Sequence, residues 1–89
     1  MVKRIVGASK EQRAATLTDI ETRLALYGLS RNINQIGELL EIVERFVEDG
    51  VNVNGSIPLE TGQRIEYVLQ NRPDPREPHK SFSSVIIKK

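Results

Sequence analysis

The chain has 89 residues, of which 38% are hydrophobic, with 13 lysines and arginines, 12 aspartates and glutamates, and no cysteine. A chain this short forms one domain with a small core, so a core shared between two subunits is expected to stabilise it. The lack of cysteine excludes disulfides, thiolate metal sites and cysteine nucleophiles. Charged residues interrupt every apolar run, so the sequence predicts no membrane span and no membrane partner, and we expect a cytoplasmic protein.

Residues 2–7, VKRIVG, predict a short N-terminal strand or extended arm. They are rich in β-branched residues and end at a glycine. Lys3 and Arg4 make this end of the chain electropositive. The backbone of a single strand needs a partner, which can be the same segment of a second subunit or the SVII run near the C-terminus.

Two amphipathic helices are predicted next, over residues 10–27 and 31–49. Ser9 and Gln12 have the spacing of a capping box, and Gly28 ends the first helix. Ser30 or Asn32 can cap the second helix, which ends before Gly50. The apolar stripe of this second helix is wide and its opposite face is acidic, so we expect the stripe to form the core of a homodimer through Ile36, Leu40, Val43, Phe46 and Val47.

The last third of the chain predicts a third helix and a tail. Asn54 and Gly55 form a strong turn dipeptide, and Pro58 suits the first turn of a helix over residues 58–71. Three prolines between residues 72 and 80 favour an extended linker. The helical domain is therefore expected to span residues 1–71. The tail at 81–89 can be disordered, add to a sheet edge or dock on a partner. The expected fold class is mainly α, with a short N-terminal β-strand, two packed helices, a third C-terminal helix and an extended tail.

No catalytic constellation is visible in the sequence. His79 is the single histidine, and it lies in the proline-rich linker. A solvated loop histidine is therefore a better interpretation than a catalytic base. There is no phosphate-binding glycine loop, zinc-protease motif or nucleophile elbow. The sequence predicts a protein that is not an enzyme and has no cofactor or metal.

The sequence GLSR at residues 28–31, followed by a capped amphipathic helix, resembles ribbon-helix-helix DNA-binding proteins. The resemblance covers roughly residues 2–50. It implies that the strand at 2–7 pairs with its twin across a dimer and enters the major groove, and that the N-terminus of the second helix binds a DNA phosphate. It therefore assigns DNA contacts to Lys3, Arg4, Ser30, Arg31 and Asn32. Which face of the strand reads the DNA stays open.

Residues 32–36, NINQI, are similar to the N-L-N-Q-I signature of MobC-type plasmid mobilisation proteins, and IPLE at 57–60 also resembles that family. This resemblance implies a relaxosome accessory that works with a relaxase. The side-chain amides of Asn32, Asn34 and Gln35 can contact phosphates, base edges or another helix. Alternatively, Asn32 caps the helix and the other two are solvated. A helix-turn-helix interpretation of LALYGLSRNINQI ranks below both resemblances.

These observations predict a small DNA-binding accessory or regulatory protein, in plasmid mobilisation or in transcription regulation. It would bind double-stranded DNA as a homodimer, with a relaxase or another protein as a possible further partner. The alternative is a helical protein-interaction module that does not bind DNA. In that interpretation the acidic second helix and the apolar tail engage a protein, which agrees with the net charge of only +1.

Overall fold

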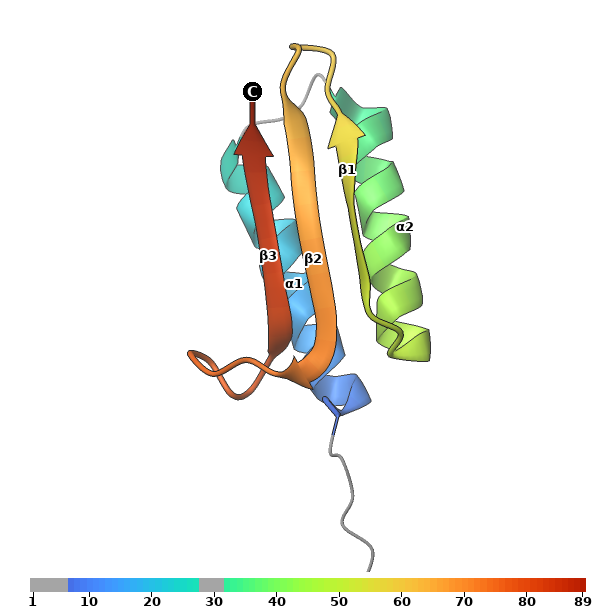
Figure 1. Ribbon diagram of the computed structural model, residues 1–89, viewed down its shortest axis with the longest axis vertical. Coiled ribbons are helices and arrows are strands. Elements are labelled where there is room, and N and C mark those ends of the chain that lie inside the picture. Colours follow the sequence, from blue (N-terminus) through green and yellow to red (C-terminus); the bar gives the residue numbers. More distant parts are fainter. Residues whose placement is uncertain (1–6, 28–31) are drawn as a thin grey trace, which may run out of the picture.

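The protein consists of a helical hairpin packed on one face of a three-stranded antiparallel sheet (Figure 1). The computed structural model describes residues 7–27 and 32–89. The elements in chain order are α1 (Lys10–Tyr27), α2 (Ile33–Asp49), β1 (Val53–Pro58), β2 (Arg64–Pro73) and β3 (Ser81–Lys88). Helices come first and strands follow, so the expected mainly α fold with an N-terminal strand is wrong. The predicted strand at 2–7 lies outside the described residues, apart from Gly7.

The first helix forms where the sequence predicts it. The backbone N–H of Gln12 donates to Ser9 Oγ at 3.1 Å, and the Ser9 N–H donates to Gln12 Oε1 at 2.6 Å, which completes the expected capping box. The helix ends at Tyr27, as predicted. Thr16, Ile20 and Leu24 are its buried residues, and they recur at four-residue intervals on one face.

The second helix begins at Ile33 and ends at Asp49, close to the predicted bounds of 31–49. Gly50 ends it in the left-handed conformation, with φ 66°, and its N–H donates to the Phe46 carbonyl at 2.8 Å. Asn32 occupies the N-cap position, but its side chain makes no capping bond. Instead, Asn32 Oδ1 accepts a 2.9 Å hydrogen bond from the backbone N–H of Glu60. The side chain of Asn32 therefore joins the start of α2 to the hairpin between β1 and β2.

The predicted third helix is wrong, because residues 64–73 form the central strand of the sheet. In β2, Ile65, Tyr67 and Leu69 are buried and the residues between them are not, which is the two-residue period of a strand. The predicted turn at Asn54-Gly55 is also wrong, since both residues lie inside β1. The chain turns between Leu59 and Gln63, whose backbone groups form a 2.7 Å hydrogen bond.

The tail predicted at 81–89 contributes the third strand. The sequence left three alternatives open for this tail, and the structure shows that it adds to a sheet edge. β3 pairs antiparallel with β2 from Arg64↔Lys88 to Gln70↔Phe82. The proline-rich segment before it is a loop, in which the Asp74 N–H donates to the Lys80 carbonyl at 2.9 Å. The sheet order is β1-β2-β3.

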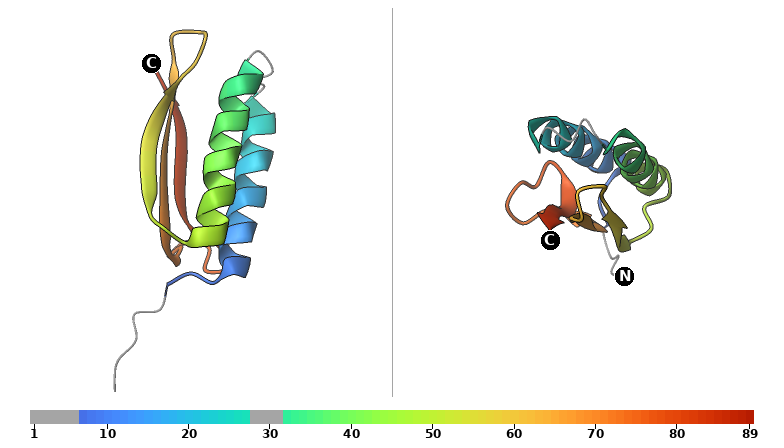
Figure 2. Two further views of the ribbon diagram at one scale, coloured as in Figure 1. Left: turned by 90° about the vertical axis from the view of Figure 1, so that its right-hand side faces the viewer. Right: turned by 90° about the horizontal axis from the view of Figure 1, so that it is seen from above.

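The core lies between the helical hairpin and the inner face of the sheet (Figure 2). Ile57, Ile65 and Leu69 face the helices from the sheet, and all are buried. α1 contacts β3 and α2 contacts β1, so the two helices lie over opposite edges of the same face of the sheet. The helices supply Ile20, Leu24, Leu39, Val43 and Phe46.

Candidate functional site

The outer face of the sheet is covered by no helix or strand among residues 7–27 and 32–89. Both helices lie on the other side of the sheet (Figure 2). Strand alternation places every second side chain on this outer face, opposite the buried Ile57, Ile65 and Val85. We call this surface the open face. Its residues are Asn54, Ser56 and Pro58 of β1, Arg64, Glu66, Val68, Gln70 and Arg72 of β2, and Phe82, Ser84, Ile86 and Lys88 of β3.

One end of the open face holds two cations around a single carboxylate. Arg64 Nε lies 2.8 Å from Glu66 Oε2, and Lys88 Nζ lies 3.6 Å from Glu66 Oε1. The hydrogen bond from Arg64, aided by the charges of Lys88 and Arg64, outweighs burial and lowers the pKa of the Glu66 carboxyl below its ordinary value. Arg64 and Lys88 meet here because the β2–β3 register sets them opposite each other. This end of the face therefore keeps an excess of positive charge.

The other end of the open face holds a cation stacked on an aromatic ring. The guanidinium carbon of Arg72 lies 4.2 Å from the centre of the Phe82 ring. Arg72 Nε also donates to Gln70 Oε1 at 2.7 Å. These two contacts hold the planar guanidinium of Arg72 in one orientation while the residue stays exposed. A guanidinium held in this way suits recognition of a phosphate or a base edge.

The helix layer has the opposite charge. The exposed residues of α2 include Glu38, Glu41, Glu44, Glu48 and Asp49. Lys10 Nζ lies 2.8 Å from Glu48 Oε2, and its hydrogen bond and charge lower the pKa of that carboxyl. Arg45 is the one cation of α2, and it is exposed. The charge of the molecule is therefore distributed unevenly, with positive charge on the open face and negative charge along α2.

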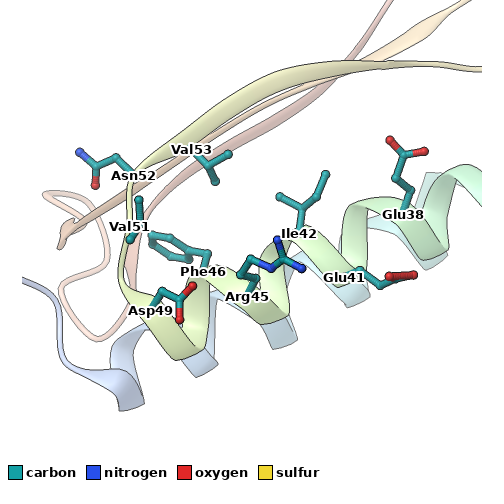
Figure 3. Close-up of a pocket in the computed structure, with 9 residues that line it drawn as sticks. All are labelled: Glu38, Glu41, Ile42, Arg45, Phe46, Asp49, Val51, Asn52 and Val53. Atoms are coloured by element: carbon teal, nitrogen blue, oxygen red, sulfur yellow. The ribbon is translucent and has the colours of Figure 1, made fainter.

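A groove lies between α2 and the first strand (Figure 3). We call it the α2/β1 groove, and its volume is about 420 Å³. Ile42 and Phe46 point from α2 toward Val53 of β1 and form its apolar floor. Val51, at one end, is 64% exposed. The other lining residues are Glu38, Glu41, Arg45, Asp49 and Asn52.

Most of the DNA contacts predicted from sequence are not assembled into one site by the described residues. Lys3, Arg4, Ser30 and Arg31 lie outside the part of the chain that the structure describes. Asn32 is 2% exposed, and its Oδ1 accepts a hydrogen bond from the backbone N–H of Glu60, so its side chain is enclosed by its own chain. Its DNA contact stays a prediction. Asn34 is exposed and Gln35 is half-buried on the first turn of α2.

The residues predicted to form a dimer core lie mainly in the core of the single chain. Val43, Phe46 and Val47 are buried, with Val43 and Phe46 inside the cluster between the helices and the sheet. Ile36 and Leu40 are half-buried and pack against the same cluster. Their burial thus needs no second subunit, since the sheet supplies the cover that the sequence analysis assigned to a dimer partner.

Sequence reasoning missed Arg64, Gln70, Arg72 and Lys88, because they were assigned to a helix, a linker and a tail. One signal was present. Buried and outward residues alternate along RIEYVLQ at residues 64–70, which is the period of a strand with one open face. The juxtaposition of Arg64 and Lys88 depends on strand register, which no local pattern contains.

Comparisons of the chain with protein-family models, with curated proteins and with solved structures found no match. Neither of the helices that the structure describes is long and apolar enough to cross a membrane. Within residues 7–27 and 32–89, no group of histidine, aspartate and glutamate side chains has the arrangement of a metal site. We therefore base the proposals for function on the geometry of the open face and of the α2/β1 groove.

Proposed function

We propose that the protein binds double-stranded DNA through the open face and acts as an accessory or regulatory protein. One observation carries the proposal: the uncovered face presents Arg64, Arg72 and Lys88 together with hydrogen-bonding side chains. Cations of this kind bind phosphates, and amides and hydroxyls bind base edges. The hydrogen-bonding side chains are Asn54, Ser56, Gln70 and Ser84.

The dimensions of the sheet favour the major groove. Three strands about 4.8 Å apart span about 10 Å between their outer backbones, and the major groove of B-DNA is about 12 Å wide. The strands bow away from the helices at mid-length, so the open face is convex (Figure 2). A convex face about as wide as the groove can approach base edges while the cations at its ends reach phosphates.

The charge of the helix layer supports the same orientation. Exposed Glu38, Glu41 and Glu44 on α2 repel a polyanion, whereas the open face attracts it. The protein would therefore approach DNA with its sheet forward and its helices facing away. This mode differs from the one implied by the ribbon-helix-helix resemblance, because the reading strands are β1, β2 and β3.

The test is fluorescence anisotropy of labelled DNA duplexes at about 50 and 200 mM salt, where phosphate contacts make affinity fall steeply as salt rises. We compare the protein with a variant carrying Arg72→Gln and Lys88→Gln. Each lost phosphate contact should reduce the slope of log affinity against log salt by about 0.9. The expected result is weaker binding and a slope smaller by about 1.8, the sum for two contacts.

The control variant carries Lys10→Gln and Arg45→Gln. It removes the same charge from the helix layer, where both side chains are exposed. Its affinity and salt slope should match those of the unsubstituted protein. Equal losses of DNA affinity in the two variants would mean that net charge, not the open face, determines binding. Absence of binding at the lower salt would exclude DNA as the ligand.

A specific role in plasmid mobilisation or in transcription is a further step of this proposal. The NINQI motif at residues 32–36 supports mobilisation by its resemblance alone. Selection of bound sequences from a random duplex pool separates specific from non-specific binding. Enrichment of one sequence supports a sequence-specific role, and no enrichment supports a role in general DNA packaging or recruitment.

A further inference from the structure

The helix layer is wider than the sheet it covers. A helix with its side chains is about 10 Å across, and strands lie about 4.8 Å apart. Two helices side by side therefore cover about four strands, whereas this sheet has three. In Figure 1, α2 extends past the edge of β1. The unmatched width lies at that edge, which is the position of the α2/β1 groove.

The edge of β1 beside the groove has unpaired backbone groups. β1 pairs with β2 on one side, and no strand of the described chain pairs with its other side. An added strand would gain backbone hydrogen bonds from Val53–Pro58. Its inward side chains would rest on Ile42 and Phe46, which now line the groove with Val53. The groove thus offers both the hydrogen bonds and the apolar contact that a fourth strand requires.

The charges along the groove specify the occupant. Glu38 and Glu41 line one end, Asp49 lines the other, and Arg45 is the one cation among them. Glu38 and Asp49 are eleven positions apart on the helix, which is about 16 Å and matches about five residues of extended strand. An apolar stretch of that length with a basic residue at each end would place opposite charges together.

A second copy of the chain does not suit this edge. Antiparallel pairing of two β1 strands would place two α2 helices beside each other. Each helix carries exposed Glu38, Glu41 and Glu44, so the two acidic faces would repel. The groove therefore favours a different protein with basic residues over self-association.

We propose that the α2/β1 groove binds an extended segment of a partner protein, which pairs with β1 as a fourth strand. The segment has alternating apolar residues over about five positions and a lysine or arginine at each end. This proposal does not depend on DNA binding, because it uses α2 and the edge of β1 in place of the open face. A protein with both surfaces could hold a partner on DNA, which agrees with an accessory role.

The probe is a labelled heptapeptide, KTVTVTK, whose two valines and two lysines face one side when it is extended, so the lysines lie on the side of the α2 carboxylates when the valines face the groove. Binding is measured by anisotropy, and its location by shifts of backbone amide signals in nuclear magnetic resonance spectra. The expected shifts lie in β1 and around Phe46. Two control peptides accompany it: ETVTVTE reverses the end charges, and KTVPVTK replaces the central threonine by proline, which cannot donate a strand hydrogen bond. Both should bind at least about tenfold more weakly.

The protein variants reverse the charge of the groove. Glu38→Lys with Glu41→Lys changes two exposed side chains, so the fold should be retained. This variant should lose affinity for KTVTVTK by at least about tenfold and gain affinity for ETVTVTE. Glu11→Lys with Glu21→Lys makes the same charge change on exposed positions of α1 and should leave both affinities unchanged.

Several results would overturn the proposal. One is equal binding of the three peptides, and another is amide shifts confined to the open face or to β3. A dimer in sedimentation equilibrium that is lost on substitution in β1 would assign the groove to a second copy. The Arg72→Gln, Lys88→Gln variant should bind KTVTVTK normally, so loss of DNA binding and loss of peptide binding are distinguishable.

Discussion

Thr16 of α1 and Ser81 of β3 join the first helix to the last strand through two buried hydroxyl groups 2.7 Å apart. The backbone N–H of Ser81 also donates to Thr16 Oγ1 at 3.0 Å. Both residues have no exposed surface. A buried polar pair is stable only when each group has a partner, so this contact fixes how α1 and β3 meet.

The Thr16→Val substitution tests this contact, because valine keeps the shape of threonine and removes the hydroxyl. The Ser81 N–H and hydroxyl then lose a partner inside the core. We expect the free energy of unfolding to fall by about 1–3 kcal/mol, measured by urea denaturation. Thr22→Val is the matched control, since the exposed Thr22 hydroxyl bonds only to the Thr18 carbonyl of its own helix. It should change stability by less than about 0.5 kcal/mol, and an equal loss in both variants would contradict the assignment.

Lys80 forms a nearly buried ion pair network at the end of the loop before β3. It is 5% exposed, and its Nζ lies 2.8 Å from Glu77 Oε2 and 3.2 Å from Asp19 Oδ2. Burial alone lowers the pKa of Lys80, but the hydrogen bonds and charges of Glu77 and Asp19 outweigh burial and raise it above its ordinary value. We expect Lys80→Met to lower the free energy of unfolding by about 1.5–3 kcal/mol at neutral pH, because the hydrogen bonds to the two carboxylates are lost.

The raised pKa of Lys80 gives this loss a defined pH dependence. The folded protein holds the proton more tightly than the unfolded chain, so the stabilisation is complete below the unfolded pKa of about 10.4. It disappears as pH rises through the folded pKa. The protein and Lys80→Met should therefore differ less in their free energy of unfolding at pH 11 than at pH 7. Urea denaturation at the two pH values measures this difference. Lys10→Met, which removes an exposed ion pair with Glu48, should leave the free energy of unfolding nearly unchanged and serves as control.

Substitution of Asn32 tests whether this residue has a structural role or contacts DNA. Asn32→Ala removes the acceptor of the Glu60 N–H and should lower the free energy of unfolding by about 1–2 kcal/mol. Asn34→Ala removes an exposed amide two residues away and should leave stability unchanged. Thermal unfolding and DNA anisotropy on both variants separate the two roles. Reduced DNA affinity for Asn32→Ala with unchanged stability would restore Asn32 as a DNA contact.

The helices could be predicted because their signals are local. The Ser9–Gln12 capping box begins α1, and Gly50 ends α2 at the residue expected from sequence. The apolar stripe of α2 was also recognised, but its cover was assigned to a second subunit. The β-sheet that buries Val43 and Phe46 comes from later parts of the chain.

The sheet could not be predicted in the same way, because each strand forms only when it pairs with another strand that is distant in the sequence. Ile65, Val68 and Leu69 fit the spacing of a helix, while Ile65, Tyr67 and Leu69 fit the spacing of a strand. Pairing on both sides, with β1 and with β3, decides between these patterns, since a central strand has its backbone fully bonded. The open face follows from that pairing. Its cations come from two strands and meet only in the folded chain.

The distance of 65 positions between Thr16 and Ser81 also bears on how the chain folds during synthesis. The ribosome releases α1 and α2 first, with the apolar side chains of Leu39, Val43 and Phe46 on a helical hairpin that has no sheet to cover it. The core closes only after β3 emerges and docks on α1. Until then the nascent chain exposes an apolar surface that chaperones recognise and that favours aggregation.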